Sequence, residues 1–265
     1  MPTASEVAER VWYGDDALAA AGRTLLGPAA ALFGAVVARR NAAFDRGTGV
    51  VRGAIPALSV GNLTVGGTGK TPVSAWFVAR LLEAGARPAL VLRGYGDDEP
   101  AVHARLNPAA NVIADPDRVA AIDAAARAGC DCAVLDDAFQ HRRAARVADV
   151  VLVSVDRWHD DVRLLPAGPF REPLASLARA SLVVLTEKAP APGRRDRARA
   201  AVARATRAEV ATVSLAAGAL RPLGGTGEDR PLATLAGQRV VAVSAIGDPA
   251  AFHRQLVAAG LDVAP

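Results

Sequence analysis

Lysine is nearly absent from this chain of 265 residues. Lys and Arg together number 31, yet only Lys70 and Lys188 are lysines. Arginine replaces lysine readily on a solvated surface but not where a compact point charge is needed, so each retained lysine is a candidate functional group. Cysteine is equally scarce: Cys130 and Cys132 cannot frame a disulfide scaffold. Their place at the start of an apolar run favours two small buried side chains over a metal site.

A secretory signal and long apolar runs are also missing. Residues 1–16 are polar and acidic, unlike a leader, which makes a cytoplasmic protein the default expectation. The most apolar stretch, 25–38, falls short of the ~20 residues that span a bilayer. The helix expected over residues 17–46 therefore either packs on the core or lies at a membrane interface. In the second case Leu25, Leu26, Leu32, Phe33 and Val37 would meet the acyl chains, and Arg39 and Arg40 the head groups.

The rest of the composition suits a folded α/β protein. Apolar residues make up 51% of the chain and charged residues 22%, which excludes a disordered chain. The net charge of +4 permits anionic ligands but selects none. Apolar strand patterns at 55–60, 88–92, 132–135, 150–154, 182–185 and 240–244 alternate with helical patterns at 71–83, 117–127, 194–207 and 249–259. Such alternation predicts a mostly parallel sheet covered on both faces, with ligands at the carboxyl ends of the strands.

Smaller signals set the boundaries of these elements. Asp115 is the expected N-cap of the helix over 117–127, with Pro116 in its first turn. Residues 190–193 and 222–231 read as loops, and the second of these would separate a smaller C-terminal lobe. We expect an N-terminal helical segment over 1–46, a main domain over 47–221 and the start of a second lobe over 222–265.

A glycine-rich segment lies between the first strand and the first helix of this pattern. It reads Thr64-Val65-Gly66-Gly67-Thr68-Gly69-Lys70-Thr71. Glycines allow backbone N–H groups to converge on phosphate oxygens, and the following helix adds its positive N-terminal dipole. In such a loop Lys70 reaches the β- and γ-phosphates and the Thr71 hydroxyl ligates Mg²⁺. Thr64 stands where the strict pattern has glycine, and a glycine-rich turn without a ligand is the simpler alternative.

A phosphate loop also needs an acidic partner for the metal ion. The apolar run 132–135 leads directly into Asp136 and Asp137, the arrangement in which a strand-end carboxylate positions Mg²⁺. The alternative is that these two residues only cap a helix or form a turn.

The ordered set of motifs resembles the tetraacyldisaccharide 4′-kinases, the lipid A 4′-kinase family of Gram-negative bacteria. The resemblance extends from Val11 to the end of the chain. Besides the phosphate loop, it is carried by Arg93-Gly94-Tyr95-Gly96, Asp98-Glu99-Pro100, Asp115-Pro116-Asp117-Arg118, Asp136-Asp137-Ala138-Phe139-Gln140-His141, the segment 164–173 and Ile246-Gly247-Asp248-Pro249. The family also has Ser or Thr where Thr64 stands.

The resemblance implies a fold of the P-loop NTPase type and a specific reaction. The γ-phosphoryl group of ATP would pass, with Mg²⁺, to the 4′-hydroxyl of a tetraacylated glucosamine disaccharide 1-phosphate. Asp98 matches the catalytic base of the family, Asp137 and Lys70 act beside it, and Thr71 and Asp136 bind the metal. The substrate contacts would be Arg93, Arg171, Gln140 and His141, although each arginine is equally well an ordinary surface residue.

The resemblance also sets expectations for partners and location. It favours the interfacial reading of residues 17–40, at the cytoplasmic face of the inner membrane, for a peripheral protein that we expect to be monomeric and not to bind nucleic acid. Ala138 replaces the glycine of the family motif, and the loop before Asp98 is short. The family continues through segments that have no counterpart here, which would make the C-terminal lobe incomplete. The alternatives are a P-loop ATPase or GTPase switch of the ParA or signal-recognition type, or a nucleotide or lipid binder without turnover.

Overall fold

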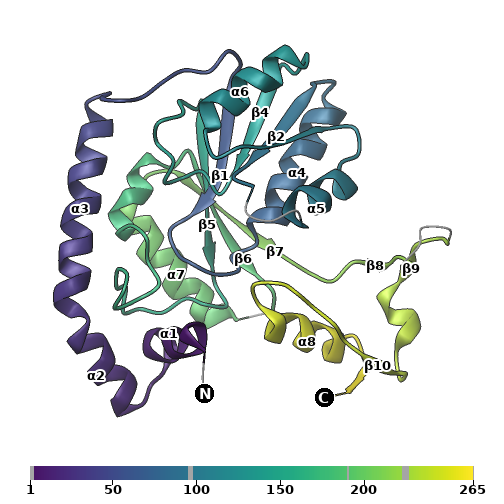
Figure 1. The fold of residues 1–265 in the computed structure, drawn as a ribbon. Coiled ribbons are helices and arrows are strands. Elements are labelled where there is room, and N and C mark those ends of the chain that lie inside the picture. Colours follow the sequence, from purple (N-terminus) through teal and green to yellow (C-terminus); the bar gives the residue numbers. More distant parts are fainter. Residues whose placement is uncertain (1–2, 95–97, 190, 223–226, 265) are drawn as a thin grey trace.

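A computed structural model describes residues 3–94, 98–189, 191–222 and 227–264. Its centre is a sheet of seven parallel strands in the order β3-β2-β4-β1-β5-β6-β7. The strands are β1 (Ala57–Asn62), β2 (Pro88–Leu92), β3 (Asn111–Ala114), β4 (Cys132–Asp136), β5 (Ala148–Ser154), β6 (Leu182–Glu187) and β7 (Glu209–Ser214). The predicted parallel α/β sheet is therefore confirmed (Figure 1).

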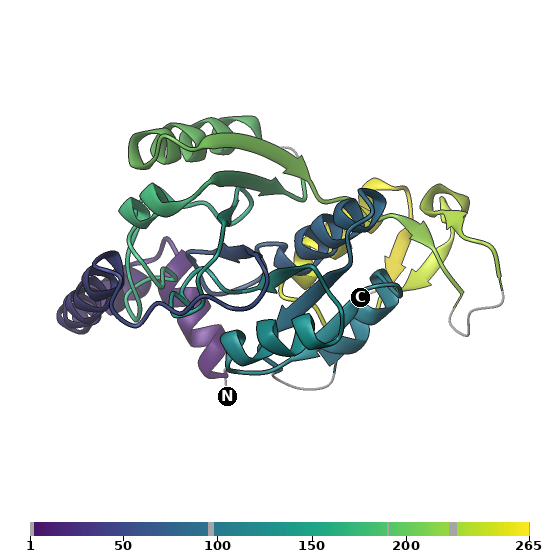
Figure 2. The same cartoon turned by 90° about the horizontal axis from the view of Figure 1, so that it is seen from above.

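Helices lie on both faces of the sheet and beyond its ends (Figure 2). They are α1 (Ala4–Tyr13), α2 (Ala17–Leu25), α3 (Gly27–Asp45), α4 (Lys70–Glu83), α5 (Asp98–Leu106), α6 (Arg118–Arg127), α7 (Pro192–Ala205) and α8 (Pro249–Ala258). Two single-turn 3-10 helices cover Leu174–Arg179 and Leu232–Leu235. Because β-strand side chains alternate between faces, each buried strand contributes to two cores.

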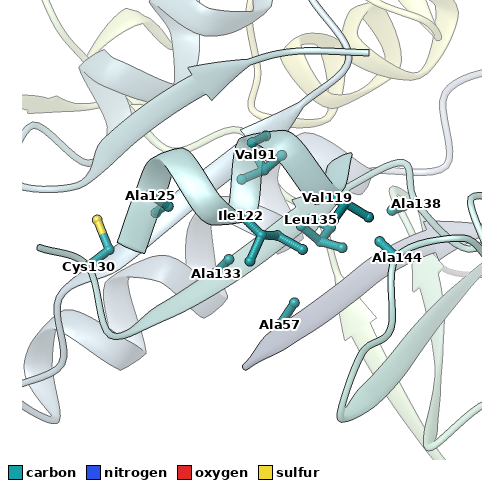
Figure 3. Packing of buried hydrophobic residues seen from close by; sticks show 12 residues of the cluster. Ala57, Val91, Val119, Ile122, Ala125, Cys130, Ala133, Leu135, Ala138 and Ala144 are labelled. Carbon is teal, nitrogen blue, oxygen red and sulfur yellow. The ribbon is translucent and has the colours of Figure 1, made fainter. Parts of the chain in front are cut away.

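The alternation divides the core into two layers. On one face, Val60, Leu90 and Val134 pack against Val73 and Val78 of α4. On the other face α6 covers one half of the sheet, in the cluster shown in Figure 3. The second half of that face packs against α7, which supplies Ala198 and Val202. A parallel sheet that is covered on both faces requires strands of continuous apolar residues. For this reason the sequence alone predicted most of these strands.

Two details of the expected elements are wrong. The helix expected over 17–46 is two helices that break at Leu26, because Pro28 lacks an N–H group and can only sit in the first turn of α3. Asp117, not Asp115, is the N-cap of α6, since its Oδ1 accepts hydrogen bonds from the N–H groups of Val119 and Ala120. Asp115 instead accepts the N–H of Asp117 and fixes the preceding turn.

The C-terminal elements are short and lie beyond one end of the sheet (Figure 1). Strands β8 (Ala219–Leu220) and β9 (Arg230–Pro231) pair antiparallel. The last two residues of the loop expected over 222–231 are therefore part of a strand. Strands β10 (Arg239–Val241) and β11 (Asp262–Ala264) pair in parallel on either side of α8 in the sequence, and the strand expected over 240–244 is correspondingly shorter. Pro190 and residues 223–226 of the two expected loops lie outside the described residues.

The N-terminal helices expose an apolar face. Leu18, Leu25, Leu32 and Val36 are 66%, 82%, 69% and 60% exposed. Val37, which the interfacial hypothesis placed among the acyl chains, is buried instead. In the described part of the chain no single helix is long and apolar enough to cross a membrane, and α2 with α3 meets that test only as a pair bent by 49°.

Gly61 in β1 is a test of the packing beneath the site. A Cβ atom on Gly61 would lie 2.6 Å from Cβ and 2.7 Å from the backbone N of Phe139, which is fully buried. We expect Gly61→Ala to lower the free energy of unfolding by about 2 kcal/mol or more, because neither contact can relax without moving the backbone after β4. Urea unfolding measures it. Gly193→Ala in α7, where the nearest atom lies 3.9 Å away, is the control and should be neutral; equal effects would contradict this packing argument.

Candidate functional site

The glycine-rich segment forms a loop at the carboxyl end of β1. Lys70 is the first residue of α4, and Gly69 is the N-cap of that helix. Gly69 has a φ of +86°, a backbone conformation that residues with a side chain rarely adopt. Two tertiary contacts hold the start of the loop: Val65 N–H donates to Pro169 O at 2.9 Å, and Asn62 Nδ2 donates to Thr68 Oγ1 at 2.7 Å. The loop thus has the strand-loop-helix geometry in which backbone N–H groups and a helix N-terminus face an anion.

Lys70 is held between opposite and like charges. Its Nζ lies 3.8 Å from Asp137 Oδ1, and Arg171 Nη2 lies 3.0 Å from the same oxygen. Burial lowers the pKa of Lys70, the charge of Asp137 opposes that shift, and Arg171 adds to it. Desolvation alone would raise the pKa of Asp137, but Lys70 and Arg171 outweigh it and hold that pKa below its ordinary value. Two cations thus converge on one carboxylate, and the positive charge left over suits a phosphate.

Asp136 is the last residue of β4 and Asp137 follows it, but the two have different surroundings. Asp136 is buried; its Oδ1 accepts hydrogen bonds from Ser74 Oγ at 3.0 Å and from Asp137 N–H at 2.9 Å. Its Oδ2 lies 3.2 Å from Nε2 of the buried His103 in α5. Asp137 adopts a φ of +48°, which aims its carboxylate outward at Lys70 and Arg171. Ala138 is not among the described residues with positive φ, so it replaces a glycine without backbone strain.

One cavity of about 1050 Å³ collects the predicted residues. Its lining includes Gly66, Gly67, Thr68, Gly69, Lys70, Thr71, Arg93, Asp98, Asp136, Asp137, Gln140, His141 and Arg171. Thr64 and Val65, predicted to bind the cofactor, lie at the base of the loop and outside this lining. Thr64 O instead accepts two hydrogen bonds from Arg171, from Nε and Nη2. Tyr95 and Gly96 of the quoted motif lie outside the described residues.

Asp98 and Glu99 bring further negative charge to this cavity from the first turn of α5. Both are exposed. Burial raises the pKa of Glu99, and so do Asp136, Asp98 and Asp137 in that order. Three carboxylates close enough to raise the pKa of a fourth create a local potential that favours a cation.

The predicted substrate contacts Gln140 and His141 carry polar atoms without partners. Gln140 Nε2 donates to Asn62 O at 2.8 Å, whereas its Oε1 and His141 Nε2 are buried and have no hydrogen-bond partner within the described part of the chain. Burial lowers the pKa of His141, with Arg118 and Arg146 acting in the same direction. His141 is therefore a neutral ring near pH 7. Both residues line the cavity, and buried polar atoms without a partner are uncommon in folded proteins.

The sequence reasoning missed several residues of the cavity. Arg118 is buried, donates to Asp115 O at 2.7 Å and lines the cavity beside Arg93; its burial, followed by the charge of Arg93, lowers its pKa. His103 and Ser74, which contact Asp136 and do not line the cavity, also had no motif to mark them. Lys188, the second of the two lysines, lines the cavity as well. The scarcity of lysine in the chain was the sequence signal that could have marked it as a functional residue.

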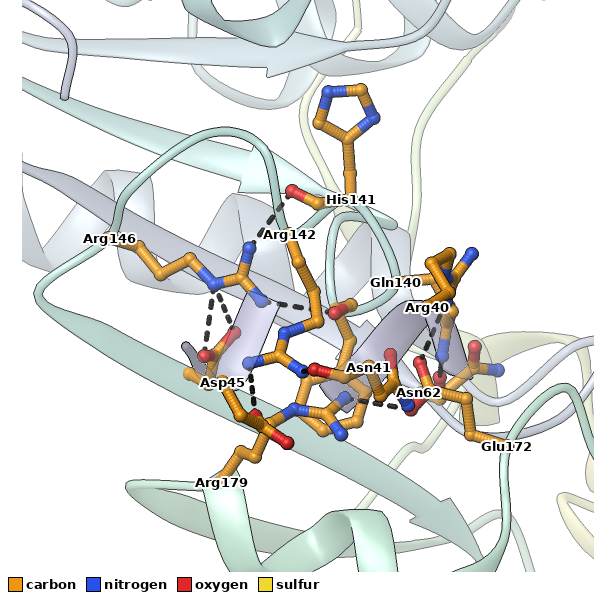
Figure 4. Close-up of polar contacts among 12 residues, drawn as sticks. Arg40, Asn41, Asp45, Asn62, Gln140, His141, Arg142, Arg146, Glu172 and Arg179 are labelled. Atoms are coloured by element: carbon orange, nitrogen blue, oxygen red, sulfur yellow. Dashed lines mark hydrogen bonds and ion pairs between the residues drawn. The ribbon is translucent and has the colours of Figure 1, made fainter. Parts of the chain in front are cut away.

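A buried ionic cluster joins α3 to the segment that carries Arg171. Glu172 is fully buried; its Oε2 accepts from Asn41 Nδ2 at 2.7 Å and from Arg179 at 2.9 Å, and its Oε1 lies 3.5 Å from Arg40 (Figure 4). Arg179 also stacks on the Phe139 ring, 4.4 Å from its centroid. The cluster therefore ties the N-terminal helix to both loops that flank the phosphate loop.

Comparisons with known proteins agree with this geometry. A family model described as tetraacyldisaccharide-1-P 4'-kinase matches residues 22–265. This chain belongs to that family. The tetraacyldisaccharide 4'-kinase of Anaeromyxobacter dehalogenans strain 2CP-1 is 41% identical over 89% of this chain and 69% of its own length. The enzyme of the same name from Halorhodospira halophila is 37% identical over 90% of this chain and 72% of its own.

A solved structure of the same family has a similar fold. LpxK from Aquifex aeolicus, in complex with ATP, is 28% identical, has a TM-score of 0.71, and covers 91% of this chain and 79% of its own. Membership in the tetraacyldisaccharide-1-P 4'-kinase family makes this chain a kinase, a phosphotransferase. The alternative of an ATPase or GTPase switch is not favoured, since these relatives are kinases by name.

The cluster around Glu172 gives a prediction for stability. We expect Glu172→Gln to lower the free energy of unfolding by about 3 kcal/mol or more, because it leaves Arg179 buried without its counter-charge. Urea unfolding at neutral pH measures the loss. Asp161→Asn, which breaks the exposed pair between Asp161 and Arg163, is the matched control and should cost under ~1 kcal/mol. Similar losses for the two variants would show that the buried cluster does not hold α3 in place.

Proposed function

We propose that this chain transfers the γ-phosphoryl group of ATP to the 4′-hydroxyl of a tetraacylated glucosamine disaccharide 1-phosphate, the step that yields lipid IVA. One observation carries the proposal: a phosphate-loop lysine, two strand-end carboxylates and Asp98 line the same cavity. The names of the relatives at 37–41% identity supply the acceptor. Phosphoryl transfer depends mainly on positioning and charge stabilisation, which these groups provide.

The cations of the cavity would hold ATP. Lys70 reaches the β- and γ-phosphates while remaining beside Asp137. Arg171, anchored by Asp137, Asn62 and the Thr64 carbonyl, presents a fixed guanidinium on the same side of the loop. Because both cations are held before the nucleotide enters, little side-chain ordering remains to be done when the transferred group gains charge.

Asp98 would accept the proton of the sugar hydroxyl. It is exposed in the cavity, in the first turn of α5. Gln140 and His141, which line the cavity, would contact the sugar, and Arg93 with Arg118 would contact its anionic groups.

The donor set also fits Mg²⁺. The structure, over its described residues, contains no group of three or more His, Cys, Asp or Glu side chains arranged around a metal position. Mg²⁺ does not require such a cage, because one or two carboxylates, waters and substrate phosphates usually hold it. Asp136, Asp137 and the Thr71 hydroxyl would supply the protein ligands. The raised pKa of the nearby Glu99 reflects the negative charge that would attract the ion. The ion would neutralise phosphate charge during transfer.

The exposed apolar face of α2 and α3 supports a peripheral site of action at the cytoplasmic face of the inner membrane. Leu18, Leu25 and Leu32 recur every seven residues and all point outward, which suits burial among acyl chains. Arg40, which is on α3 as Leu32 is, lines the cavity. Docking of this face would therefore bring the cavity to the bilayer surface where an acylated substrate resides. We propose that the protein acts there as a monomer.

The reaction is tested with radiolabelled ATP and the tetraacyldisaccharide 1-phosphate in mixed micelles. The unaltered chain should form labelled lipid, and Asp98→Asn should lower kcat by about 10² to 10⁴-fold through loss of the proton acceptor. Binding of ATP without any labelled lipid would refute the kinase proposal for this chain and favour a binder without turnover.

The same assay tests the need for a compact cation in the phosphate loop. Lys70→Arg should lower kcat/KM by about 10²-fold or more, because the planar guanidinium does not fit where an ammonium meets two phosphates. The reverse exchange Arg221→Lys, at an exposed ion pair with Asp229, is the control and should leave turnover unchanged. Ordinary turnover by Lys70→Arg would show that the charge alone matters.

Membrane docking is tested by co-sedimentation with vesicles that contain anionic phospholipid. The double variant Leu25→Ser, Leu32→Ser should bind at least tenfold more weakly, since each leucine buried in the bilayer contributes about 1.5–3 kcal/mol. Its turnover on substrate in detergent micelles should be unchanged. Val147→Ser, at a valine that is 74% exposed outside the two helices, is the matched control. Unchanged vesicle binding by the double variant would exclude this face as the docking surface.

A further inference from the structure

The second lysine of the chain contacts the phosphate loop from outside. Lys188 follows β6, and its Nζ donates to Gly67 O at 2.9 Å and to Asp248 Oδ2 at 2.7 Å. Its side chain is only 15% exposed, so both bonds are formed in a largely desolvated position. Hydrogen bonds from a charged donor are stronger than neutral ones in such surroundings.

A neighbouring bond repeats the pattern one residue further along the loop. Thr186 Oγ1 donates to Thr68 O at 2.8 Å, and Thr186 is buried. Two consecutive carbonyl oxygens of the phosphate loop are thus bound by side chains from the end of β6. A carbonyl that turned into the anion site would set oxygen against oxygen, so these two bonds favour the conformation that presents N–H groups to a phosphate.

The partner of Lys188 belongs to the C-terminal lobe. Asp248 is the N-cap of α8, and its Oδ1 accepts the Ala251 N–H at 3.1 Å. Burial would raise the pKa of Asp248, but the hydrogen bonds from Lys188 and Ala251 hold it below its ordinary value. From the second turn of α8, Gln255 Nε2 donates back to Lys188 O at 2.8 Å.

The phosphate loop also contacts the turn before α8 directly. A Cβ atom on Gly67 would lie 2.8 Å from the carbonyl carbon of Gly247, so the phosphate loop and the turn before α8 meet with no space for a side chain. A shift of α8 would therefore move Gly67, break its bond to Lys188, or both.

We propose that Lys188 is a positioning residue that couples the docking of α8 to the phosphate-binding conformation of residues 66–69. The proposal rests on the nucleotide site described above and adds a control point to it. Lys188 need not touch the nucleotide. It keeps the Gly67 carbonyl turned outward while Asp248 fixes the ammonium, so that ATP binding and α8 docking stabilise each other.

Equilibrium binding of ATP to the full chain provides the first test. Lys188→Met should raise the Kd for ATP by about tenfold or more, the effect of losing a charged hydrogen bond. In the kinase assay the variant should have a higher KM for ATP and an unchanged KM for the lipid acceptor. Arg221→Met, which removes an exposed cation paired with Asp229, is the control and should bind ATP normally.

Asp248→Ser separates the two tasks of Asp248. Serine still accepts the Ala251 N–H as a helix cap but carries no charge for Lys188. We expect Asp248→Ser to weaken ATP binding as Lys188→Met does, and the double variant to be no weaker than either single variant. Hydrogen exchange at the amides of residues 66–69 should be faster in both single variants than in the unaltered chain.

The outcomes distinguish this inference from the proposed function. Unaltered ATP affinity in Lys188→Met, or additive losses in the double variant, would overturn the coupling while leaving the kinase proposal intact. If Lys188→Met does not fold, Asp248→Ser with the same readouts decides the question. Failure of the unaltered chain to bind ATP would overturn the nucleotide site and this inference with it.

Discussion

The parallel direction of the seven strands is the constraint on which the whole site depends. All strands end at the same edge of the sheet, so whatever follows each strand is delivered to one place. The phosphate loop follows β1, Arg93 follows β2, Asp136 and Asp137 end β4, and Lys188 comes after β6. Residues separated by more than a hundred positions thereby become neighbours without any local signal that pairs them.

The charges at this edge of the sheet are unevenly balanced. Lys70 and Arg171 share one carboxylate, and the pKa of Lys70 is lowered because burial is incompletely offset. Glu99 shows the opposite imbalance, since neighbouring carboxylates raise its pKa. A cavity that holds an excess of each sign in separate places is complementary to an anion and a cation bound together. A nucleotide triphosphate with its metal ion has this charge pattern.

Two peripheral parts of the chain are attached to the same loops. The N-terminal helix α3 reaches them through Asn41 and the buried Glu172, next in sequence to Arg171. The C-terminal helix α8 reaches them through Asp248 and Lys188. Both attachments are charged contacts in desolvated positions, where loss of one partner leaves the other uncompensated. A movement of α3 or of α8 would therefore displace the loops that form the site.

By itself, the sequence determined the strand and helix pattern, the phosphate loop and the acidic strand end, because each is a local arrangement with a known period or spacing. The family motifs extended this to Asp98 and Arg171. Only the tertiary structure decided that Asp117 caps α6, that Val37 faces inward, and that His103 lies beside Asp136. It also gave a place to Lys188, whose partners are 121 and 60 residues away. Contacts at such separations depend on how the strands are ordered in the sheet, and no local sequence pattern encodes that order.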